Sequence, residues 1–529
     1  MIQDSFKFNL KIHSKENMLN LVSQYYLNKL YRSAQLNRDQ LIRKQEQNWS
    51  HIRAYLKGTK LSNDFNLQNF NTYSDLRNYG PILSYENLSP YIDQTLKLEK
   101  NIMTPDLPVR VGLTSGTTGK HGKKIPINQP MLNQFNWSRR YILSSILNEF
   151  RIDSIKKIKS LSLSAQAEVY IENGLSYGYI SGIINQYIPY PLHNNFYPQK
   201  ELPSPDQWDK RILALDLEIK GVELQIVAGI PAVILETLES LCQHYGVSSL
   251  NTIFPQIKYC VFGGTDISLY RKRLNEVCGR ELHYFGSYVA SEAPIGLPIA
   301  STKEIASYLL NPNIIVGFES LIKPRKIEGV GEVKVGDCYR ILLTMPNGFI
   351  QYPLMDEIEI LSTEPIFSFK IIGRKGGGLN LATEKIDEAR LSKVIQSFSD
   401  LNLVKVFGYT VAPYFDSKNP SYEIFLFIGS TENKYNELLD SKELLGSYAR
   451  TIDEIMMKQN QDYKESRNAG VIKPLQLKVL PQEALVNYIR LNAEAGQVKI
   501  PTVFRERNNL LQFFQNKLKL NTDQLGILP

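Results

Sequence analysis

Apolar residues near the start of the chain recur at the spacing of a helix. In residues 17–57 they stand at every third or fourth position, as at Leu19, Val22, Tyr26 and Leu30, which places them on one helix face. Residues 71–96 mix turn residues with short helical patterns, and residues 131–150 again carry a helical pattern. The sequence therefore predicts helices both before and after the segment around residues 109–128.

Short apolar runs that end in small residues predict strands. Residues 109–113 alternate apolar positions before a loop of Gly, Thr and Lys. Residues 257–266 and 282–298 each join a short apolar run to a turn rich in small residues. From about residue 330 the pattern is that of strands and hairpins, with Pro346-Asn347-Gly348 as a turn signal.

A stretch of glycines divides the pattern into two parts. Gly376–Gly378 mark a candidate hinge at residues 374–378. Beyond it, strand-like runs and helical patterns suit a compact α+β unit. We therefore expect an α/β protein, with a large N-terminal domain of β-sheets flanked by helices at 1–372 and a smaller C-terminal domain at 373–529.

Composition places the chain among ordinary globular proteins. Its 529 residues are 43% hydrophobic and 22% charged, which allows more than one core. No run of about 18 apolar residues occurs, and the first residues lack the apolar core of a signal peptide. We therefore expect a soluble, cytoplasmic protein with no membrane partner.

Charge and cysteine content narrow the function classes further. The net charge of +8 is mild for this length, and its short basic clusters favour solvated helix faces over a nucleic-acid partner. A moderately basic groove would also suit a polyphosphate substrate. The four cysteines form no CxxC pair and have no histidine at metal-ligand spacing, which argues against a zinc site or a disulfide framework.

The segment from Thr114 to Pro126 is the first candidate for chemistry. Its small residues let backbone N–H groups approach a ligand closely, while its hydroxyls and lysines add donors and positive charge. These features suit a triphosphate, although the segment does not match the Walker A pattern. A solvated surface loop is the alternative. The candidate ligands are Thr114, Ser115, Gly116, Thr117, Thr118, Gly119 and Lys120.

Two further motifs each follow a predicted strand. Gly263-Gly264-Thr265 would leave room for a flat base against the backbone, although most such glycine pairs are turns. Glu292 stands among small and apolar residues, where a carboxylate needs a partner, and Mg²⁺ bound to phosphates is a natural one. The alternative for Glu292 is a helix cap or a salt bridge.

A fourth motif combines Tyr352, Asp356 and Arg374. An aspartate at the edge of a strand can accept hydrogen bonds from both ribose hydroxyls, and an arginine near it can steady a nucleotide. Routine charges on a surface strand are the alternative. The order of these four motifs along the chain is more specific than any one of them.

The motifs together resemble those of a known superfamily. The loop TSGTTGKHGKKIP resembles the signature loop of the adenylate-forming enzymes, and the chain is most similar to their auxin-responsive acyl-acid-amido synthetases. YVASEAPIG resembles that family's Tyr-x-Ser-Ser-Glu segment, with Ser291 and Glu292 matching. The likeness covers roughly residues 70–505.

The chain departs from the family pattern at two places. The family's Tyr-Arg-x-Gly-Asp is replaced by Tyr352-Pro353-Leu354-Met355-Asp356, and its Gln-x-Lys-x-Pro-Arg ends in Thr502 instead of arginine. Asp356 is kept, so ribose binding is still expected. The first departure motivates one alternative, a catalytically impaired nucleotide-binding regulator.

The resemblance implies ATP and Mg²⁺ as cofactors and a role for each motif. The loop from Ser115 with Lys120 would hold the β- and γ-phosphates, and Glu292 would ligate Mg²⁺. Gly264, Thr265 and Tyr288 would frame the adenine beside Ser291. Asp356 would hold the ribose, and Arg374 would lie on the hinge side. Tyr177, Tyr179 and Ile230 are candidates for the acyl pocket, with core packing as the alternative.

The resemblance also implies a ligase reaction in two steps. A carboxylic acid would be adenylated, and an amine, an amino acid in this family, would then take the acyl group. The mobile C-terminal domain would deliver a lysine to the first step, with Lys499 as the first candidate and Lys385 as the second. An acyl-CoA ligase on the same fold, which would form a thioester, is a further alternative.

Overall fold

The fold was analysed in a computed structural model of the chain. It describes residues 25–114, 123–150, 158–188, 192–203, 207–264, 267–299, 307–321, 326–374, 379, 381, 386, 388–416, 419–429, 438, 440–468, 471–493, 500–504 and 506–520. Among the helices of these segments, none combines the length and apolar character that crossing a membrane requires.

The first described segments are helical. Residues 25–33 are helical, and this helix ends before α2 (Arg38–Tyr55) begins. Asn37 and Gln40 cap α2 reciprocally, because each side chain accepts the other's backbone N–H at 3.0 Å. Within its described residues, 25–57, the predicted helical pattern is therefore divided between two helices. Further short helices follow: α3 (Lys60–Asp64), η1 (Leu67–Asn69), α4 (Tyr73–Tyr79) and α5 (Tyr85–Leu96).

Twelve described strands form a large sheet, in the order β13-β12-β14-β15-β16-β11-β10-β9-β8-β7-β3-β6. From β13 to β9 neighbouring strands run antiparallel, and from β9 to β6 they run parallel. The antiparallel strands are β9 (His283–Val289), β10 (Pro294–Pro298), β11 (Ser307–Leu310), β12 (Ile315–Ser320), β13 (Ile327–Glu328), β14 (Cys338–Thr344), β15 (Tyr352–Ser362) and β16 (Ser368–Arg374). The parallel half adds β3 (Ser160–Ser162), β6 (Phe196–Tyr197), β7 (Ile226–Gly229) and β8 (Tyr259–Gly263).

Helices cover both faces of the parallel half. Alternate residues of a strand point to opposite faces, so Tyr259 packs with α6 while Cys260 and Phe262 pack with α9 and α10. These helices are α6 (Gln129–Glu149), α8 (Trp208–Ile219), α9 (Pro231–Tyr245) and α10 (Ser268–Cys278). A small sheet beside them, in the order β2-β1-β5-β4, consists of β1 (Arg110–Leu113), β2 (Lys124–Ile127), β4 (Tyr170–Glu172) and β5 (Leu175–Tyr179), followed by α7 (Ile180–Gln186).

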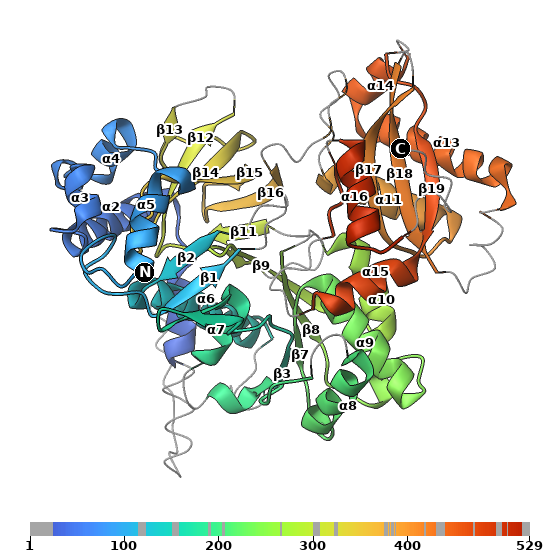
Figure 1. The fold of residues 1–529 in the computed structure, drawn as a ribbon, viewed down its shortest axis with the longest axis horizontal. Helices are drawn as coiled ribbons and strands as arrows, with labels where there is room; N and C mark the ends of the chain where they lie inside the picture. Colours follow the sequence, from blue (N-terminus) through green and yellow to red (C-terminus); the bar gives the residue numbers. More distant parts are fainter. Residues whose placement is uncertain are drawn as a thin grey trace, which may run out of the picture.

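The last part of the chain builds a separate three-stranded sheet, drawn in orange and red in Figure 1. Its strands are β17 (Val406–Asp416), β18 (Asn419–Ile428) and β19 (Gln476–Pro481). The helices around it are α11 (Glu388–Asn402), α13 (Lys442–Gln459), α14 (Gln461–Asn468), α15 (Gln482–Leu491) and α16 (Arg507–Asn516). We call residues 388–520 the C-terminal unit; the predicted boundary at 372/373 stays a prediction.

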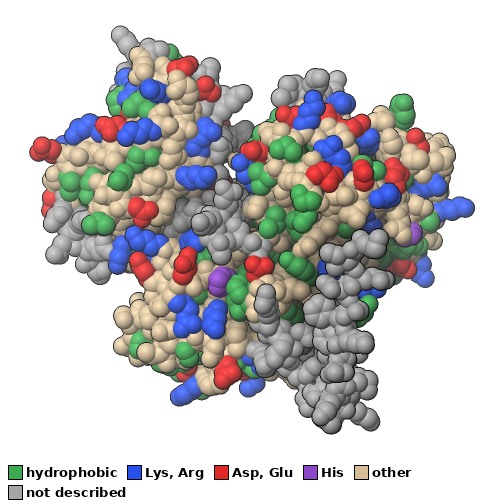
Figure 2. Space-filling view, turned by 180° about the vertical axis from the view of Figure 1, so that it is seen from behind, with side chains coloured by type: hydrophobic (Ala, Val, Ile, Leu, Met, Phe, Trp, Pro, Cys, Tyr) green, Lys and Arg blue, Asp and Glu red, His purple; other side chains and the backbone are tan. Residues whose placement is uncertain are grey.

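The C-terminal unit packs against α8–α10 through apolar side chains. Phe425, Leu485 and Phe514 belong to the same buried cluster as Leu215 and Leu238 of α8 and α9. The sequence pattern had indicated two domains but not this shared cluster. The α/β fold class with a large N-terminal part is confirmed by this architecture (Figure 1). The far face shows basic and acidic side chains mixed over its surface (Figure 2).

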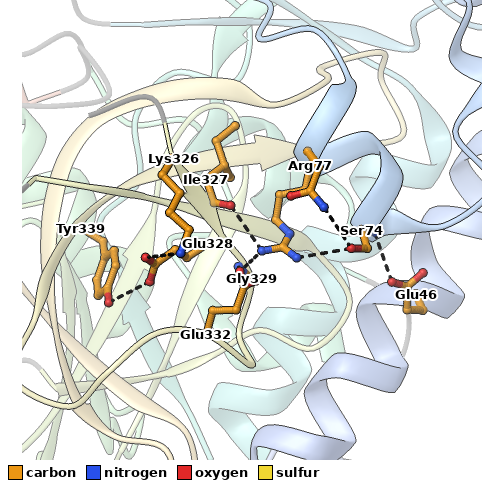
Figure 3. A network of polar contacts seen from close by, with 10 residues as sticks. Glu46, Ser74, Arg77, Lys326, Ile327, Glu328, Gly329, Glu332 and Tyr339 are labelled. Carbon is orange, nitrogen blue, oxygen red and sulfur yellow. Dashed lines mark hydrogen bonds and ion pairs between the residues drawn. The ribbon is translucent and has the colours of Figure 1, made fainter. Parts of the chain in front are cut away.

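Arg77 fixes helix α4 to the edge of the large sheet, as Figure 3 shows. Its guanidinium contacts the Glu332 carboxylate and donates to the Ile327 carbonyl oxygen at 3.3 Å. The Glu332 carboxylate also accepts the Gly329 backbone N–H at 2.9 Å. Partial burial opposes ionisation of Glu332, but the Gly329 N–H and Arg77 outweigh it and lower the pKa of this carboxyl.

This ion pair predicts a pH-dependent contribution to stability. A carboxyl whose pKa is lowered by folding stabilises the protein above its ordinary pKa and loses that effect as the pH falls through the folded value. Glu332→Gln should therefore lower the free energy of unfolding at pH 7 by about 1 kcal/mol at most, since Glu332 is partly exposed. The difference between variant and wild type, measured by urea unfolding, should shrink below pH 4.5. A difference that stays constant down to pH 3 would contradict this account.

Candidate active site

Several predicted site residues within the described part of the chain lie where the large sheet changes from parallel to antiparallel strands. Ligands of open α/β sheets bind beyond the carboxyl ends of parallel strands, at such a change of strand order. β8 and β9 end there side by side, with Gly263 opposite Ser287. The chain then turns tightly from β9 into β10, because Ala290 and Ala293 exchange backbone hydrogen bonds around Ser291 and Glu292.

Thr114 and Lys123 close the base of the candidate phosphate loop. The Thr114 backbone N–H donates to the Lys123 carbonyl oxygen at 3.0 Å, and the Lys123 N–H donates to the Thr114 hydroxyl oxygen at 2.8 Å. Because β1 and β2 pair antiparallel up to Leu113 and Lys124, the loop leaves the sheet at a fixed point. Ser115, Gly116, Thr117, Thr118, Gly119 and Lys120 lie outside the described residues.

A chain of polar contacts leads from this loop base to Glu292. The Lys123 ammonium donates to the Tyr352 hydroxyl oxygen at 2.7 Å and lies over the Tyr85 and Tyr352 rings. The Tyr352 hydroxyl in turn hydrogen-bonds the Glu292 carboxylate; burial, followed by the negative charge of Glu292, raises the pKa of Tyr352. Lysine can only donate, so the tyrosine proton points to Glu292.

Glu292 is chemically suited to Mg²⁺. Its side chain is 8% exposed, and a carboxylate so enclosed needs positive partners. Mg²⁺ commonly takes one or two protein carboxylates and completes its shell with water and substrate phosphates, so a single glutamate beside a phosphate loop is sufficient. Within the described part of the chain, no cluster of three His, Cys, Asp or Glu side chains forms a ready metal cage.

Tyr288 and Asp356, two of the predicted site residues, also contact each other. The Tyr288 hydroxyl donates to the Asp356 carboxylate at 2.6 Å, while its ring packs against Tyr308 and Phe369 with centroids 6.0 and 6.3 Å away. Tyr288 is therefore a core residue whose hydroxyl holds Asp356 in place. Its predicted contact with adenine stays a prediction.

The departures at Pro353 and Met355 fall in a bulge of β15. Leu342 of β14 pairs with Pro353, and Arg340 pairs with Glu357. A span of two residues on β14 therefore lies opposite a span of four residues on β15. Bulges re-aim side chains beside functional sites and tolerate a proline that cannot donate. The family glycine is thus not needed to bring Asp356 to Tyr288. Beyond the bulge, Asp356 pairs with Arg374 of β16; of Arg374 only the backbone is described.

Tyr352 and Asp356 therefore mark two ends of the site. They lie four residues apart on β15, but the bulge between them makes their separation shorter than the roughly 13 Å that four steps of a regular strand span. The end at Tyr352 carries Glu292, Lys123 and the phosphate loop. The end at Asp356 carries acceptors for hydroxyl groups. This separation suits a nucleotide that lies along β15 with its ribose at Asp356 and its phosphates toward Glu292.

Gly264 offers open backbone next to these groups. Its φ of +85° is one that residues with a Cβ rarely adopt, and no atom lies within 4 Å of the place where a Cβ would be. The backbone at Gly264 is therefore not shielded by a side chain of its own, and its predicted contact with a flat base stays a prediction. Thr265 lies outside the described residues, as do both candidate lysines, Lys385 and Lys499.

Two family models match the chain. The GH3 family N-terminal domain matches residues 35–245, and the GH3 family C-terminal domain matches residues 389–508. The chain belongs to the GH3 family. The sequence-based family assignment is therefore confirmed.

Relatives of this GH3 protein are named amido synthetases. Indole-3-acetic acid-amido synthetase GH3.4 of Arabidopsis thaliana is 25% identical over 40% of this chain and 38% of its own length. Jasmonoyl–L-amino acid synthetase GH3.5 of Oryza sativa subsp. japonica is 26% identical over 51% of this chain and 49% of its own length. The matched region thus spans less than half of these relatives.

Solved structures show the same fold over nearly the whole chain. The AtGH3.15 acyl acid amido synthetase in complex with 2,4-DB has a TM-score of 0.74 at 18% identity, over 94% of this chain and 96% of its own. A 2-hydroxyisobutyryl-CoA ligase has a TM-score of 0.54 at 10% identity, over 98% of both chains. At such identities the likeness establishes the fold alone.

Two residues of the candidate site have contacts that the sequence did not predict. Tyr85 lies in the lead-in helix α5, yet its hydroxyl accepts the Lys124 backbone N–H at 3.0 Å and its ring faces the Lys123 ammonium. Lys123 belongs to the loop segment that was predicted to bind phosphates. Its hydrogen bond to Tyr352 joins residues 229 positions apart in the sequence. The spacing of the basic pair Lys123-Lys124 was the only local signal.

The candidate acyl-pocket residues differ in their surroundings. Tyr177 is fully buried and stacks on Tyr170 with ring centroids 4.6 Å apart, so its core role is the better supported one. Tyr179 and Ile230 are only partly buried. Both follow carboxyl ends of strands, at the end of β5 and just after β7, where a substrate can reach them.

Proposed function

We propose that this GH3 protein is an ATP-dependent ligase that adenylates a carboxylic acid and transfers the acyl group to the amine of an amino acid. AMP and pyrophosphate are the other products. The observation that carries the proposal is the linked arrangement of Lys123, Tyr352 and Glu292 at the base of the phosphate loop, on the same strand as Asp356. The names of the curated relatives support the amide product.

In the first half-reaction, a carboxylate oxygen attacks the α-phosphorus of ATP, and the bond to pyrophosphate breaks. A carboxylate is already nucleophilic, so catalysis consists of positioning and of charge neutralisation. Thr114 and Lys123 hold the phosphate loop, and Glu292 would hold Mg²⁺, which neutralises phosphate charge when bound. Asp356, steadied by Tyr288, fixes the ribose and with it the direction of attack.

In the second half-reaction, the neutral amine attacks the acyl carbonyl, the bond to AMP breaks, and the amine loses a proton. As part of this proposal, residues 373–529 act as a lid that turns about 374–378 in the cytoplasmic enzyme. The lid brings a lysine to the first step, with Lys499 as the first candidate and Lys385 as the second.

Exchange of labelled pyrophosphate into ATP tests the first half-reaction with a panel of carboxylic acids. We expect exchange that depends on acid and on Mg²⁺, because adenylation is reversible while the adenylate stays bound. Addition of amino acids should then yield an amide detected by mass spectrometry. ATP binding without exchange for any acid would instead favour a nucleotide-binding regulator.

A thioester-forming ligase is the second candidate, and the fold shared with 2-hydroxyisobutyryl-CoA ligase is the observation that favours it. The two products are distinguished by the acceptor. Consumption of the adenylate by CoA, with no amide from any of the amino acids, would overturn the amide assignment while leaving the adenylation step intact.

A further inference from the structure

Helix α6 carries an arginine, Arg139, whose two Nη atoms find no hydrogen-bond partner among the residues that the structure describes. Both Nη atoms of Arg139 are shielded from solvent, and they make no hydrogen bond within the described structure. Burial, and then the charge of the adjacent Arg140, lowers the pKa of Arg139 to about 9, so the guanidinium still carries its charge at neutral pH. A buried charge without a counterion is strongly unfavourable.

The position of Arg139 along α6 places it at the level of the active site. Phe150, just after α6, lies with its ring 4.6 Å from Tyr259 and 4.4 Å from His283, which begin β8 and β9. The helix therefore runs antiparallel to these strands. Arg139 lies three turns before Phe150, about 16 Å along the axis, and β8 reaches its carboxyl end about 13 Å from Tyr259.

Arg139 also points toward the sheet. Ile142, Leu143 and Ile146 follow Arg139 by three, four and seven residues, so the four side chains lie on one face of the helix. The three apolar side chains pack on the parallel strands. Side chains of a helix lean toward its N-terminus, which here is the direction of the strands' carboxyl ends. The guanidinium thus faces the same edge of the sheet as Gly264 and Glu292.

The sheet beneath this guanidinium is incompletely covered. Near the end of α6 the strands present large buried residues, such as Tyr259 and Phe285. Toward their carboxyl ends the residues on the same face are small and only partly buried. They are Ser162, Ala228, Val261 and Ser287, which we call the α6 strip. The partial exposure of these four residues shows that α6 does not cover the strip completely.

We propose that Arg139 binds a second anionic group of the acid substrate, so that the enzyme selects acids with two acidic groups. The inference rests on the proposed function and names its substrate class. The carboxylate that reacts is a poor partner for Arg139, because adenylation removes the negative charge of that carboxylate. The buried guanidinium would then again have no counterion. A second carboxylate keeps its charge in the acid, the adenylate and the amide.

The test compares matched acids that differ only in the second carboxylate, such as hexanoate with adipate and benzoate with the benzene dicarboxylates. Wild-type protein should favour the better diacid over its monoacid by at least about 100-fold in kcat/KM for pyrophosphate exchange, as a site built for a polar group rejects the analogue that lacks it. Arg139→Met should abolish or reverse this preference, while the KM for ATP stays unchanged.

Arg140→Met is the matched control. Arg140 is the next residue but lies on another side of α6, where its guanidinium reaches the Tyr26 hydroxyl at 3.3 Å. This variant should keep the diacid preference. Equal use of diacids and monoacids by the wild type, or a preference that survives in Arg139→Met, would overturn the inference but not the ligase assignment. Absence of exchange with every acid would instead count against the ligase.

Two measurements need no turnover. Calorimetric titration should show that the diacid binds wild-type protein more tightly than the monoacid and that Arg139→Met loses this difference. Removal of an unpaired buried charge should also raise the thermal unfolding temperature of the ligand-free protein. A lowered unfolding temperature would reveal a structural partner of Arg139, and equal binding of both acids would refute the anion site.

Discussion

Replacement of Glu292 by alanine or glutamine is expected to abolish adenylation while the fold is kept. Glu292 is enclosed, and its carboxylate is joined through Tyr352 to Lys123 at the base of the phosphate loop. Loss of a metal-ligating carboxylate should reduce kcat for pyrophosphate exchange at least about 1,000-fold, equivalent to about 4 kcal/mol of transition-state stabilisation.

The glutamine variant separates charge from packing. It keeps the volume of Glu292 and can still accept a hydrogen bond from Tyr352, so its thermal unfolding temperature should remain close to that of the wild type. Glu281→Ala is the control for loss of a glutamate outside the candidate site, since that side chain precedes β9 and is 76% exposed. Exchange at the normal rate by Glu292→Gln, over a range of Mg²⁺ concentrations, would show that the metal is held elsewhere.

The motif order made part of this site predictable, because the phosphate loop, Gly263-Gly264 and Glu292 each follow a strand and Asp356 lies within one. Glu292 follows β9 in a tight turn, and Asp356 and Arg374 occupy paired strands, so local sequence was enough to bring them to one edge. The register of β15 was not predictable. The bulge between Pro353 and Glu357 depends on the pairing with β14, which residues 338–344 alone do not specify.

The contacts that sequence reasoning missed are those decided by tertiary packing. Arg139 has the same helical pattern as its apolar neighbours, and only burial without a counterion sets it apart. Likewise, the hydroxyl of Tyr288 meets Asp356 across the sheet order β9-β10-β11-β16-β15. The spacing of apolar residues predicts which face of a helix or strand a residue occupies. It does not predict which residue from a distant part of the chain packs against that face.

The contact between the C-terminal unit and α9 is a further example, and it gives the second large prediction. The Arg490 Nε atom of α15 lies 2.6 Å from Glu236 Oε1 of α9, and the Glu236 side chain is almost fully buried. Ser240 donates to the same carboxylate oxygen at 3.2 Å, and Trp208 lies under the Arg490 guanidinium. Burial raises the pKa of Glu236, and Arg490 opposes this shift.

Arg490→Ala is expected to destabilise the folded protein by about 3 kcal/mol, because it leaves a buried carboxylate without its counterion. Urea unfolding at pH 7 measures this loss, with Arg450→Ala on the exposed side of α13 as the control. Glu236→Ala should cost less, since the Arg490 side chain is 28% exposed and can turn to water.

The double variant decides between a charge effect and simple loss of packing. If the unpaired carboxylate is the cause, Arg490→Ala with Glu236→Ala should be more stable than Arg490→Ala alone. The penalty in Arg490→Ala should also shrink at lower pH, because a carboxyl whose pKa is raised by folding is stabilised once it is protonated. Additive losses that do not change with pH would show that the apolar cluster, and not this ion pair, holds the C-terminal unit on α9.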